Sequence, residues 1–142
     1  MSSKLSERLK VTHYDEDAAT ATNAHDIGWV DMKDYDRILV TAFASALTGV
    51  GVTAFSIIGN TDASGGGSDV TIVSHAVGSA PDAVGDYLVL ECSKDDIVAA
   101  GETLRYVSAN ITMANAADEN VVTYIQEAKT AKASNTADVV AS

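Results

Sequence analysis

Short apolar segments separated by polar or glycine-containing turns recur along the chain. Most of these segments alternate apolar and polar side chains, as does a strand that buries one face. Eight strands are predicted on this basis: Val11–Tyr14, Ile27–Met32, Arg37–Ser45, Val52–Gly59, Val70–Val77, Tyr87–Ser93, Leu104–Met113 and Val121–Gln126. Because no long amphipathic helix interrupts them, the pattern predicts an all-β fold. We expect an antiparallel β-sandwich or jelly-roll-like barrel of about eight strands, with one short helix and extended terminal arms.

Two of the segments allow more detailed predictions. Arg37–Ser45 is apolar almost throughout, which indicates a strand that is central or buried on both faces. The sequence LTGVG that follows predicts a hairpin that pairs this strand with Val52–Gly59. In the segment Leu104–Met113, the residues expected to point inward are Val107, Ala109, Ile111 and Met113, and those expected to point outward are Tyr106, Ser108, Asn110 and Thr112.

The single helical signal follows the strand Tyr87–Ser93. Ser93 can cap a helix, Asp95 and Asp96 suit its first turn, and Gly101 can end it. We therefore expect one or two helical turns between residues 93 and 101.

The 142 residues correspond to about one domain. Residues 1–10 are polar and are predicted to form an N-terminal arm, residues 11–127 the β-sandwich domain, and residues 128–142 a C-terminal tail without periodicity. The stretch DEDAATATNA (residues 15–24) is predicted to be a loop, and NTDASGGGSD (residues 60–69) a sharp turn in which successive glycines accept positive φ angles.

The chain is strongly acidic, with a formal net charge of −11 and only nine Lys and Arg residues. This balance argues against binding to nucleic acid and to an anionic membrane surface, since both need clustered cations. No apolar run reaches the roughly 18 residues of a membrane span. The polar N-terminus is unlike a secretory signal, so we expect synthesis in the cytoplasm. Cys92, the only cysteine, is predicted to be a buried apolar residue rather than a nucleophile.

Two groups of residues resemble metal sites. Asn60, Asp62 and Ser64 stand at alternate positions, as in the first half of a calcium loop, but the twelfth position is Thr71, which cannot supply the required carboxylate. A polar turn is the preferred interpretation. The second group contains His13, Asp15, Asp17, His25 and Asp26, for which an exposed acidic loop is preferred over a zinc or manganese site.

Catalytic patterns are equally weak. The sequence contains no G-x-S-x-G nucleophile motif, and the pair Asp95 and Asp96 is explained by the helix start. The triple glycine at 65–67 is not followed by a helix that carries a lysine, as a phosphate-binding loop would be. We therefore expect no catalytic residue, no metal and no cofactor, and predict that the protein is not an enzyme.

Candidate interface residues come from the arm and from the first half of the domain. Trp29 and Tyr35 have amphipathic rings of the kind enriched at interfaces, although core packing is the preferred role for Trp29. His75 alternates with Thr71 and Val73 and is predicted to be half-buried or at an interface. The complete set of candidates is Lys4, Leu5, Leu9, Trp29, Tyr35 and Asp62.

The order and style of several segments resemble the small β-sandwich virion proteins of tailed bacteriophages, namely the capsid decoration or cement proteins. The segments that carry this resemblance lie within residues 27–113: Trp29–Met32 (WVDM), Tyr35–Thr41 (YDRILVT), Ser56–Gly65 (SIIGNTDASG), Tyr87–Glu91 (YLVLE) and Leu104–Thr112 (LRYVSANIT). The resemblance implies a protein without catalysis that binds the major capsid protein on the outer face of the capsid in many copies, often as trimers.

Two other functions remain open at the level of sequence. The chain could be another virion component, such as a tail tube, a head–tail connector or a receptor-binding module. A small enzyme or metal protein is the alternative from a different class, and it would require the acidic residues of positions 13–26 to meet His75 around an ion.

Overall fold

Nine strands and two short helices are present in the parts of the chain that the computed structural model describes, which are residues 5–16, 24–48, 51–75 and 83–130. The helices are α1 (Leu5–Arg8) and α2 (Lys94–Ala100), and the strands are β1 (Leu9–Glu16), β2 (His25–Asp26), β3 (Val30–Asp31), β4 (Tyr35–Ala46), β5 (Val52–Asn60), β6 (Val70–His75), β7 (Tyr87–Ser93), β8 (Tyr106–Met113) and β9 (Glu119–Ala128).

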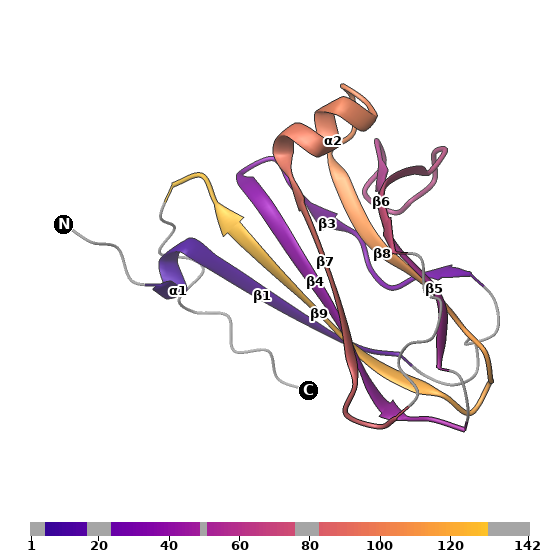
Figure 1. The fold of residues 1–142 in the computed structure, drawn as a ribbon. Coiled ribbons are helices and arrows are strands. Elements are labelled where there is room, and N and C mark those ends of the chain that lie inside the picture. The colour runs from indigo at the N-terminus through magenta and orange to yellow at the C-terminus, as the bar shows by residue number, and fades with distance from the viewer. Residues whose placement is uncertain (1–4, 17–23, 49–50, 76–82, 131–142) are drawn as a thin grey trace.

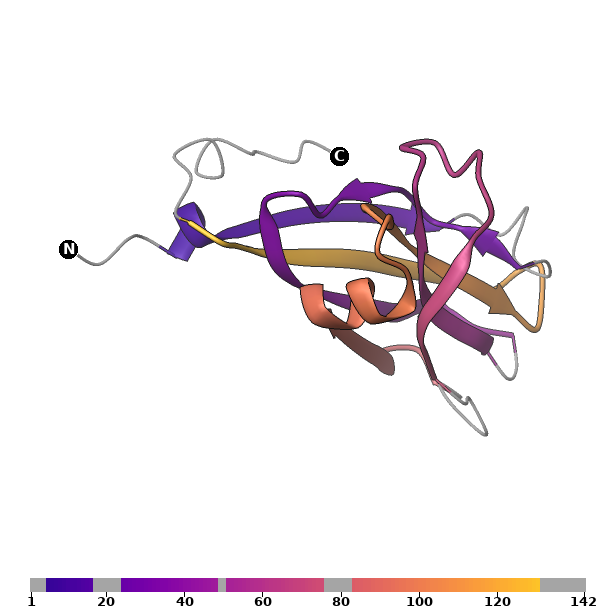
Figure 2. The same cartoon turned by 90° about the horizontal axis from the view of Figure 1, so that it is seen from above.

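The strands form two sheets that pack face to face (Figure 1). Sheet A has the order β1-β9-β4-β7, and sheet B has the order β2-β8-β5-β6, with β3 also paired to β8. All the pairings are antiparallel. Seen from above, the strands of sheet A lie side by side while β5 and β6 run across their direction (Figure 2).

Strands β2 and β3 are two parts of one interrupted strand beside β8. His25 lies opposite Ile111, and Asp31 lies opposite Tyr106, so both parts run antiparallel to β8 with a slip of one residue between them. If β2 and β3 are counted as one strand, the eight strands can be renumbered from 1 to 8 in chain order. Sheet A then has the order 1-8-3-6 and sheet B the order 2-7-4-5. This is the strand order of a jelly roll.

The prediction of an all-β antiparallel sandwich with jelly-roll character is therefore confirmed. The barrel form of that prediction is wrong for the described residues, because hydrogen-bonded pairing ends at β1 and β7 in sheet A and at β6 in sheet B. Closure would require ladders between the sheets, and the sheets instead meet only through their side chains.

The hydrophobic core lies between the two sheets and is built from the inward-pointing side chains of the strands. β7 supplies Leu88, Leu90 and Cys92, as its alternation predicted. The inward residues predicted for β8 are all buried: Val107, Ala109, Ile111 and Met113. The opposite set is not uniformly outward, because Ser108 is only 1% exposed.

Two predictions about β4 need correction. β4 pairs with β7 and β9, whereas β5 lies in the other sheet, so the segment between them crosses from sheet to sheet and is not a hairpin. The central position of β4 is confirmed, but burial on both faces is wrong, since Phe43 is 42% exposed. The apolar residues on the second face of β4 therefore lie on the outside of the molecule.

The structure also moves several boundaries. α1 and the first two residues of β1 occupy most of the expected arm at residues 1–10, and β9 continues to Ala128. Leu9 pairs with Glu127, so the first and last strands are neighbours. Asp15 and Glu16 continue β1 instead of starting a loop, and only Val30–Asp31 of the predicted strand Ile27–Met32 is extended. Residues 76–77 of the fifth predicted strand lie outside the described residues.

The predicted short helix is confirmed as α2. The Ser93 hydroxyl accepts from the Asp96 backbone N–H at 3.2 Å, and the Asp96 carboxylate accepts from the Ser93 N–H at 2.8 Å. This reciprocal capping box fixes the helix start. It also fixes the position of α2, which packs against β4, β6 and β7 and adds the buried Ile97 to the core.

Candidate functional site

Most of the buried polar groups described in the sandwich make structural hydrogen bonds, and those of Tyr124 and Ser108 connect the two sheets. The interruption between β2 and β3 leaves backbone groups of β8 without strand partners, and Tyr124 of the opposite sheet reaches them. Its hydroxyl donates to the Gly28 carbonyl at 2.9 Å and accepts from the Ala109 N–H at 2.7 Å. The Ser108 hydroxyl accepts from the Gly28 N–H at 3.2 Å, which explains why Ser108 is buried.

The surroundings of Tyr124 are apolar and tightly packed. Burial raises the pKa of the Tyr124 hydroxyl far above its ordinary value, more than its hydrogen bonds lower it. The Tyr14 ring lies 5.0 Å from the Tyr124 ring, centroid to centroid, and burial also raises the pKa of Tyr14. A Cβ at position 28 would lie 2.6 Å from the Tyr14 ring, so the glycine is required there. The contacts of these tyrosines with Gly28 and Ala109 therefore connect the two sheets.

Buried Asp118 has a similar structural role at the opposite end of the sandwich. Its Oδ1 accepts from the Thr48 N–H at 2.7 Å and from the Thr48 hydroxyl at 2.9 Å. This contact ties the segment after β4 to the segment before β9. Three buried oxygens have no hydrogen-bond partner in the described part of the chain: Ser45 Oγ, Asp118 Oδ2 and Asn120 Oδ1. Among them Asp118 alone is acidic, so they do not form a carboxylate cluster.

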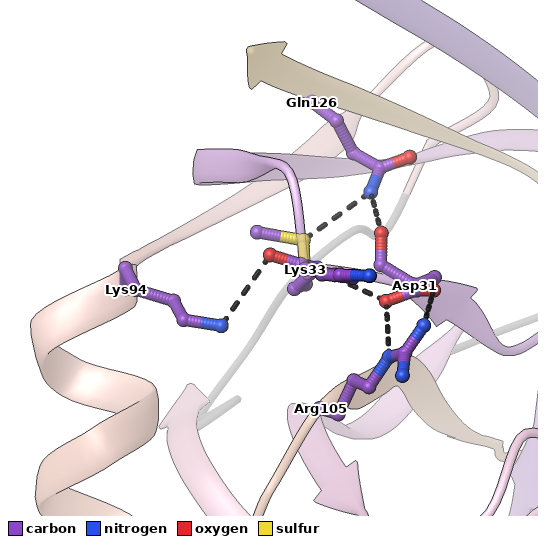
Figure 3. A network of polar contacts seen from close by, with 6 residues as sticks. Asp31, Lys33, Lys94, Arg105 and Gln126 are labelled. Atoms are coloured by element: carbon purple, nitrogen blue, oxygen red, sulfur yellow. Dashed lines mark hydrogen bonds and ion pairs between the residues drawn. The ribbon is translucent and has the colours of Figure 1, made fainter. Parts of the chain in front are cut away.

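A polar network links the two sheets where β3 ends and β8 begins (Figure 3). Arg105 makes two hydrogen bonds to the Asp31 carboxylate, with Nε–Oδ1 at 3.0 Å and Nη2–Oδ2 at 2.7 Å. The hydrogen bond from Arg105 is the largest cause of a lowered pKa at Asp31. Gln126 Nε2 of sheet A donates to the Asp31 carbonyl at 3.0 Å, and Lys94 Nζ lies 3.4 Å from the Met32 carbonyl. Each of these side chains therefore has a hydrogen-bond partner within the protein.

An open hollow of about 370 Å³ lies close to this network. Its lining carries four cationic and three anionic side chains, which are Arg8, Arg37, Lys94 and Lys129 against Asp36, Asp95 and Glu127. Arg8 pairs with Glu127 at 2.9 Å, and both side chains are partly exposed. We call this end of the sandwich, with α1, α2, the start of β4 and the end of β9, the helical end.

Among the residues that the structure describes, lysine and arginine are confined to the helical end. All the described Lys and Arg residues lie in the two helices or at or next to the strand ends at that end of the sandwich: Arg8, Lys10, Lys33, Arg37, Lys94, Arg105 and Lys129. The opposite end of sheet A, which we call the far end, contains the exposed residues Asp86 and Glu119 and no described Lys or Arg. The molecule therefore has a charge polarity along the strands of sheet A.

The outward face of sheet A is apolar, a feature that the sequence reasoning missed. The residues that alternate with the buried set have their side chains on this face, and eight of them are apolar: Leu9, Val11, Leu39, Phe43, Tyr87, Val89, Val121 and Ile125. Tyr87 is 66% exposed and Val89 is 46% exposed. We call this set the outer face. The signal for it was present in the near-continuous apolar runs RILVTAF and VVTYI.

The predicted interface candidates do not converge on one surface. Leu5 is 71% exposed in α1, and Leu9 lies on the outer face. Tyr35 is buried in the core. Asp62 is exposed in the loop after β5, and Lys4 lies outside the described residues.

Trp29 has a structural contact that accounts for its position. It lies in the interruption between β2 and β3 and is partly buried. Gly65 has φ of 72°, and a Cβ there would overlap the indole ring of Trp29. Trp29 thus packs on the 60–69 loop and is not part of the hydrophobic core, so the preferred core-packing role is not confirmed. The positive φ of Gly65 agrees with the predicted turn.

The loop that resembled a calcium site uses its polar groups internally. Asn60 Nδ2 donates to Asp69 Oδ1 at 2.7 Å. Asp62 Oδ1 accepts from the N–H and the hydroxyl of Ser64, and the hydroxyl contact is the largest cause of a lowered pKa at Asp62. Within the described residues, no group of three or more His, Cys, Asp or Glu side chains could hold a metal ion. Asp17 of the other proposed cluster lies outside those residues.

Cys92 is buried, as predicted, and is a free thiol. Burial, followed by the charges of Asp96 and Glu91, raises its pKa to about 12. A thiol in this state is a poor nucleophile at neutral pH.

Comparison of the chain with models of known protein families and with curated proteins finds no match. Within the described residues, neither helix is long and apolar enough to cross a membrane.

Proposed function

We propose that this protein is a non-enzymatic structural component of a bacteriophage virion that decorates and stabilises the capsid exterior. It binds the major capsid protein in many copies and forms homo-oligomers. The sequence resemblance is the origin of this proposal. The jelly-roll order adds support of a general kind, since viral capsid proteins use the same architecture, as do lectins and cupins.

One structural observation carries the proposal further. The chain enters sheet A at Leu9 and leaves it at Ala128, and these two strands pair through Leu9 and Glu127. Both terminal segments therefore join the described body at its helical end. Two segments that start from one place can contact the same partner together, and linked contacts raise affinity without a large rigid interface.

The charge of the body is consistent with this role. A protein of net charge −11 is repelled by packaged nucleic acid and attracted to basic regions of a coat protein. Most buried polar side chains of the described residues make hydrogen bonds within the protein. The hollow at the helical end is open and of mixed charge. Attachment through surfaces is the function that this arrangement supports best.

The test is a binding assay with capsids that lack the protein. Purified chain is added over a range of concentrations, and the bound copies are counted against coat subunits. Saturation at a fixed ratio is expected. Binding to tails alone, or no saturable binding to capsids, would contradict decoration and favour another virion position.

Truncation tests the contribution of the terminal segments. Removal of residues 1–10 would delete Leu9 and Lys10 from β1 and would weaken folding, so the informative truncations are 1–4 and 131–142. We expect each to weaken capsid binding while the free energy of unfolding stays within about 0.5 kcal/mol of the full chain. Unchanged capsid affinity after both truncations would refute the role of these segments.

A further inference from the structure

The outer face of sheet A is too apolar for a surface that remains in water. In an antiparallel sandwich the outward side of each sheet is ordinarily polar, so that strands alternate between apolar and polar residues. Here Leu39 and Phe43 of β4 point away from the core, as do Val121 and Ile125 of β9. Such a face indicates that both sides of sheet A are covered in the working form of the protein.

The apolar residues form continuous rows across the sheet. One row joins Val11, Ile125 and Leu39 through direct strand pairing. A second row joins Val121, Phe43 and Tyr87. Thr123, Thr41 and Val89 lie between them. Residues directly opposite each other in neighbouring strands have side chains on the same side, so these rows form one surface.

Among the described side chains of this surface, the charged ones lie at its margins. Arg37 and Glu127 form the row at the helical end, where the Arg37 Nε lies 4.0 Å from the Glu127 carboxylate. Glu91 lies on β7, which is the edge strand. A partner that covers the centre of the face therefore meets apolar groups, and the charges remain at a hydrated rim.

We infer that the partner is a second copy of this chain. The two outer faces pack against each other about a twofold axis perpendicular to the strands, so that the helical end of each copy lies over the far end of the other. An interface of this kind is self-complementary, because the row Val11, Ile125 and Leu39 of each copy meets the row Val121, Phe43 and Tyr87 of the other.

The charge polarity of sheet A favours this orientation. The helical end has the cations Arg8, Arg37 and Lys129, whereas the far end has Asp86 and Glu119 and no described Lys or Arg. The helical end also contains Asp36, Asp95 and Glu127, so its charge is mixed. Antiparallel packing places its cations next to the acidic far end of the other copy, twice per dimer. The parallel alternative would put the two acidic far ends together, which is unfavourable.

The area of the outer face determines how strongly the two copies are expected to bind each other. Four strands about 4.8 Å apart and seven residues at about 3.4 Å each give a flat footprint of roughly 450 Å² per copy. Two copies bury about 900 Å² if both faces are treated as flat, and protruding side chains add to this area. The value is close to the lower limit of about 1,000 Å² for specific interfaces. We therefore expect a reversible dimer with a dissociation constant on the order of micromolar.

This inference does not depend on capsid decoration, and its test uses the free full-length chain. Sedimentation velocity at physiological salt, from about 1 μM to about 500 μM, should show a shift from monomer to dimer mass. Val89→Lys places a charge within the face and should raise the dissociation constant at least about tenfold. The matched control is Val98→Lys, since Val98 is equally exposed at 44% but lies on α2. It should dimerise like the parent chain.

Tyr87→Lys provides a second variant in case Val89→Lys folds poorly, because Tyr87 is the more exposed residue. A monomer at every concentration of the parent chain would overturn the inference. A trimer mass, or equal dimerisation of Val89→Lys and Val98→Lys in folded protein, would do the same.

Cross-linking tests the orientation. Arg37 lies at the helical end and Asp86 next to the far end, with about 20 Å of strand between their rows. A bis-maleimide shorter than this distance should join Arg37→Cys to Asp86→Cys in a mixture, with a lower yield for either variant alone. The native thiol of Cys92 is buried and should remain unmodified. A higher yield for Arg37→Cys alone would indicate parallel packing and refute the proposed arrangement.

Discussion

The Tyr124 hydroxyl is the polar bridge between the two sheets, and its removal is the most informative single change. Tyr124→Phe keeps the ring and its contact with Tyr14. It removes the two short hydrogen bonds of the hydroxyl, to the Gly28 carbonyl and from the Ala109 N–H. Neither backbone group has a strand partner at this point, because β2 and β3 are interrupted beside β8.

The expected cost follows from the burial of these groups. Ala109 is 0% exposed, so its N–H is left without any partner, at a cost of about 1–3 kcal/mol. Gly28 is only partly buried, and its carbonyl regains some contact with water. We expect a total loss of roughly 2–3 kcal/mol, a large part of the 5–15 kcal/mol typical of a domain. The corresponding decrease in Tm is about 5–10 °C.

Equilibrium unfolding in urea measures this loss, with the m-value as a check that the transition stays two-state. Tyr87→Phe is the matched control because its ring is 66% exposed on the outer face. It should change the free energy of unfolding by no more than about 0.5 kcal/mol. If Tyr124→Phe costs no more than Tyr87→Phe, the sheets are held together without this bridge and the reasoning is refuted.

Three further changes test other parts of the structure. Gly65→Ala, at a φ of 72° against the Trp29 ring, should cost about 1–3 kcal/mol and shift the emission of this single tryptophan to longer wavelength, whereas Gly66→Ala, with ordinary contacts, should do neither. Burial raises the pKa of Cys92 from 9.0 to about 12, so the folded state holds this proton and loses stability as pH rises above 9. Between pH 9 and 10 the parent chain should lose about 1 kcal/mol more than Cys92→Ala in parallel unfolding curves, and equal slopes would argue against a buried, protonated thiol. Ser93→Ala should cost about 1 kcal/mol by loss of the helix cap, and a change below about 0.3 kcal/mol in denaturant unfolding would mean that the cap is not formed in solution.

The sequence alone determined most of the long strands and the capped helix α2. Alternating side chains set the strands because the pleat of a strand places successive residues on opposite faces, and this period is local. β7 was predicted with its bounds, and the inward set of β8 was predicted residue by residue. The cap at Ser93 was also readable, since its partner Asp96 is three residues away.

Only the tertiary structure decided how those strands are assigned to sheets. β4 and β5 are separated by a short glycine-containing link that would suit a hairpin, yet they lie in different sheets. The Tyr124 bridge, the charge polarity and the apolar outer face likewise depend on residues brought together from strands far apart in the sequence. The physical reason is that pairing and sheet packing are chosen by burial summed over the whole domain, whereas the pattern of one segment reports only that a face is to be buried and not by which neighbour.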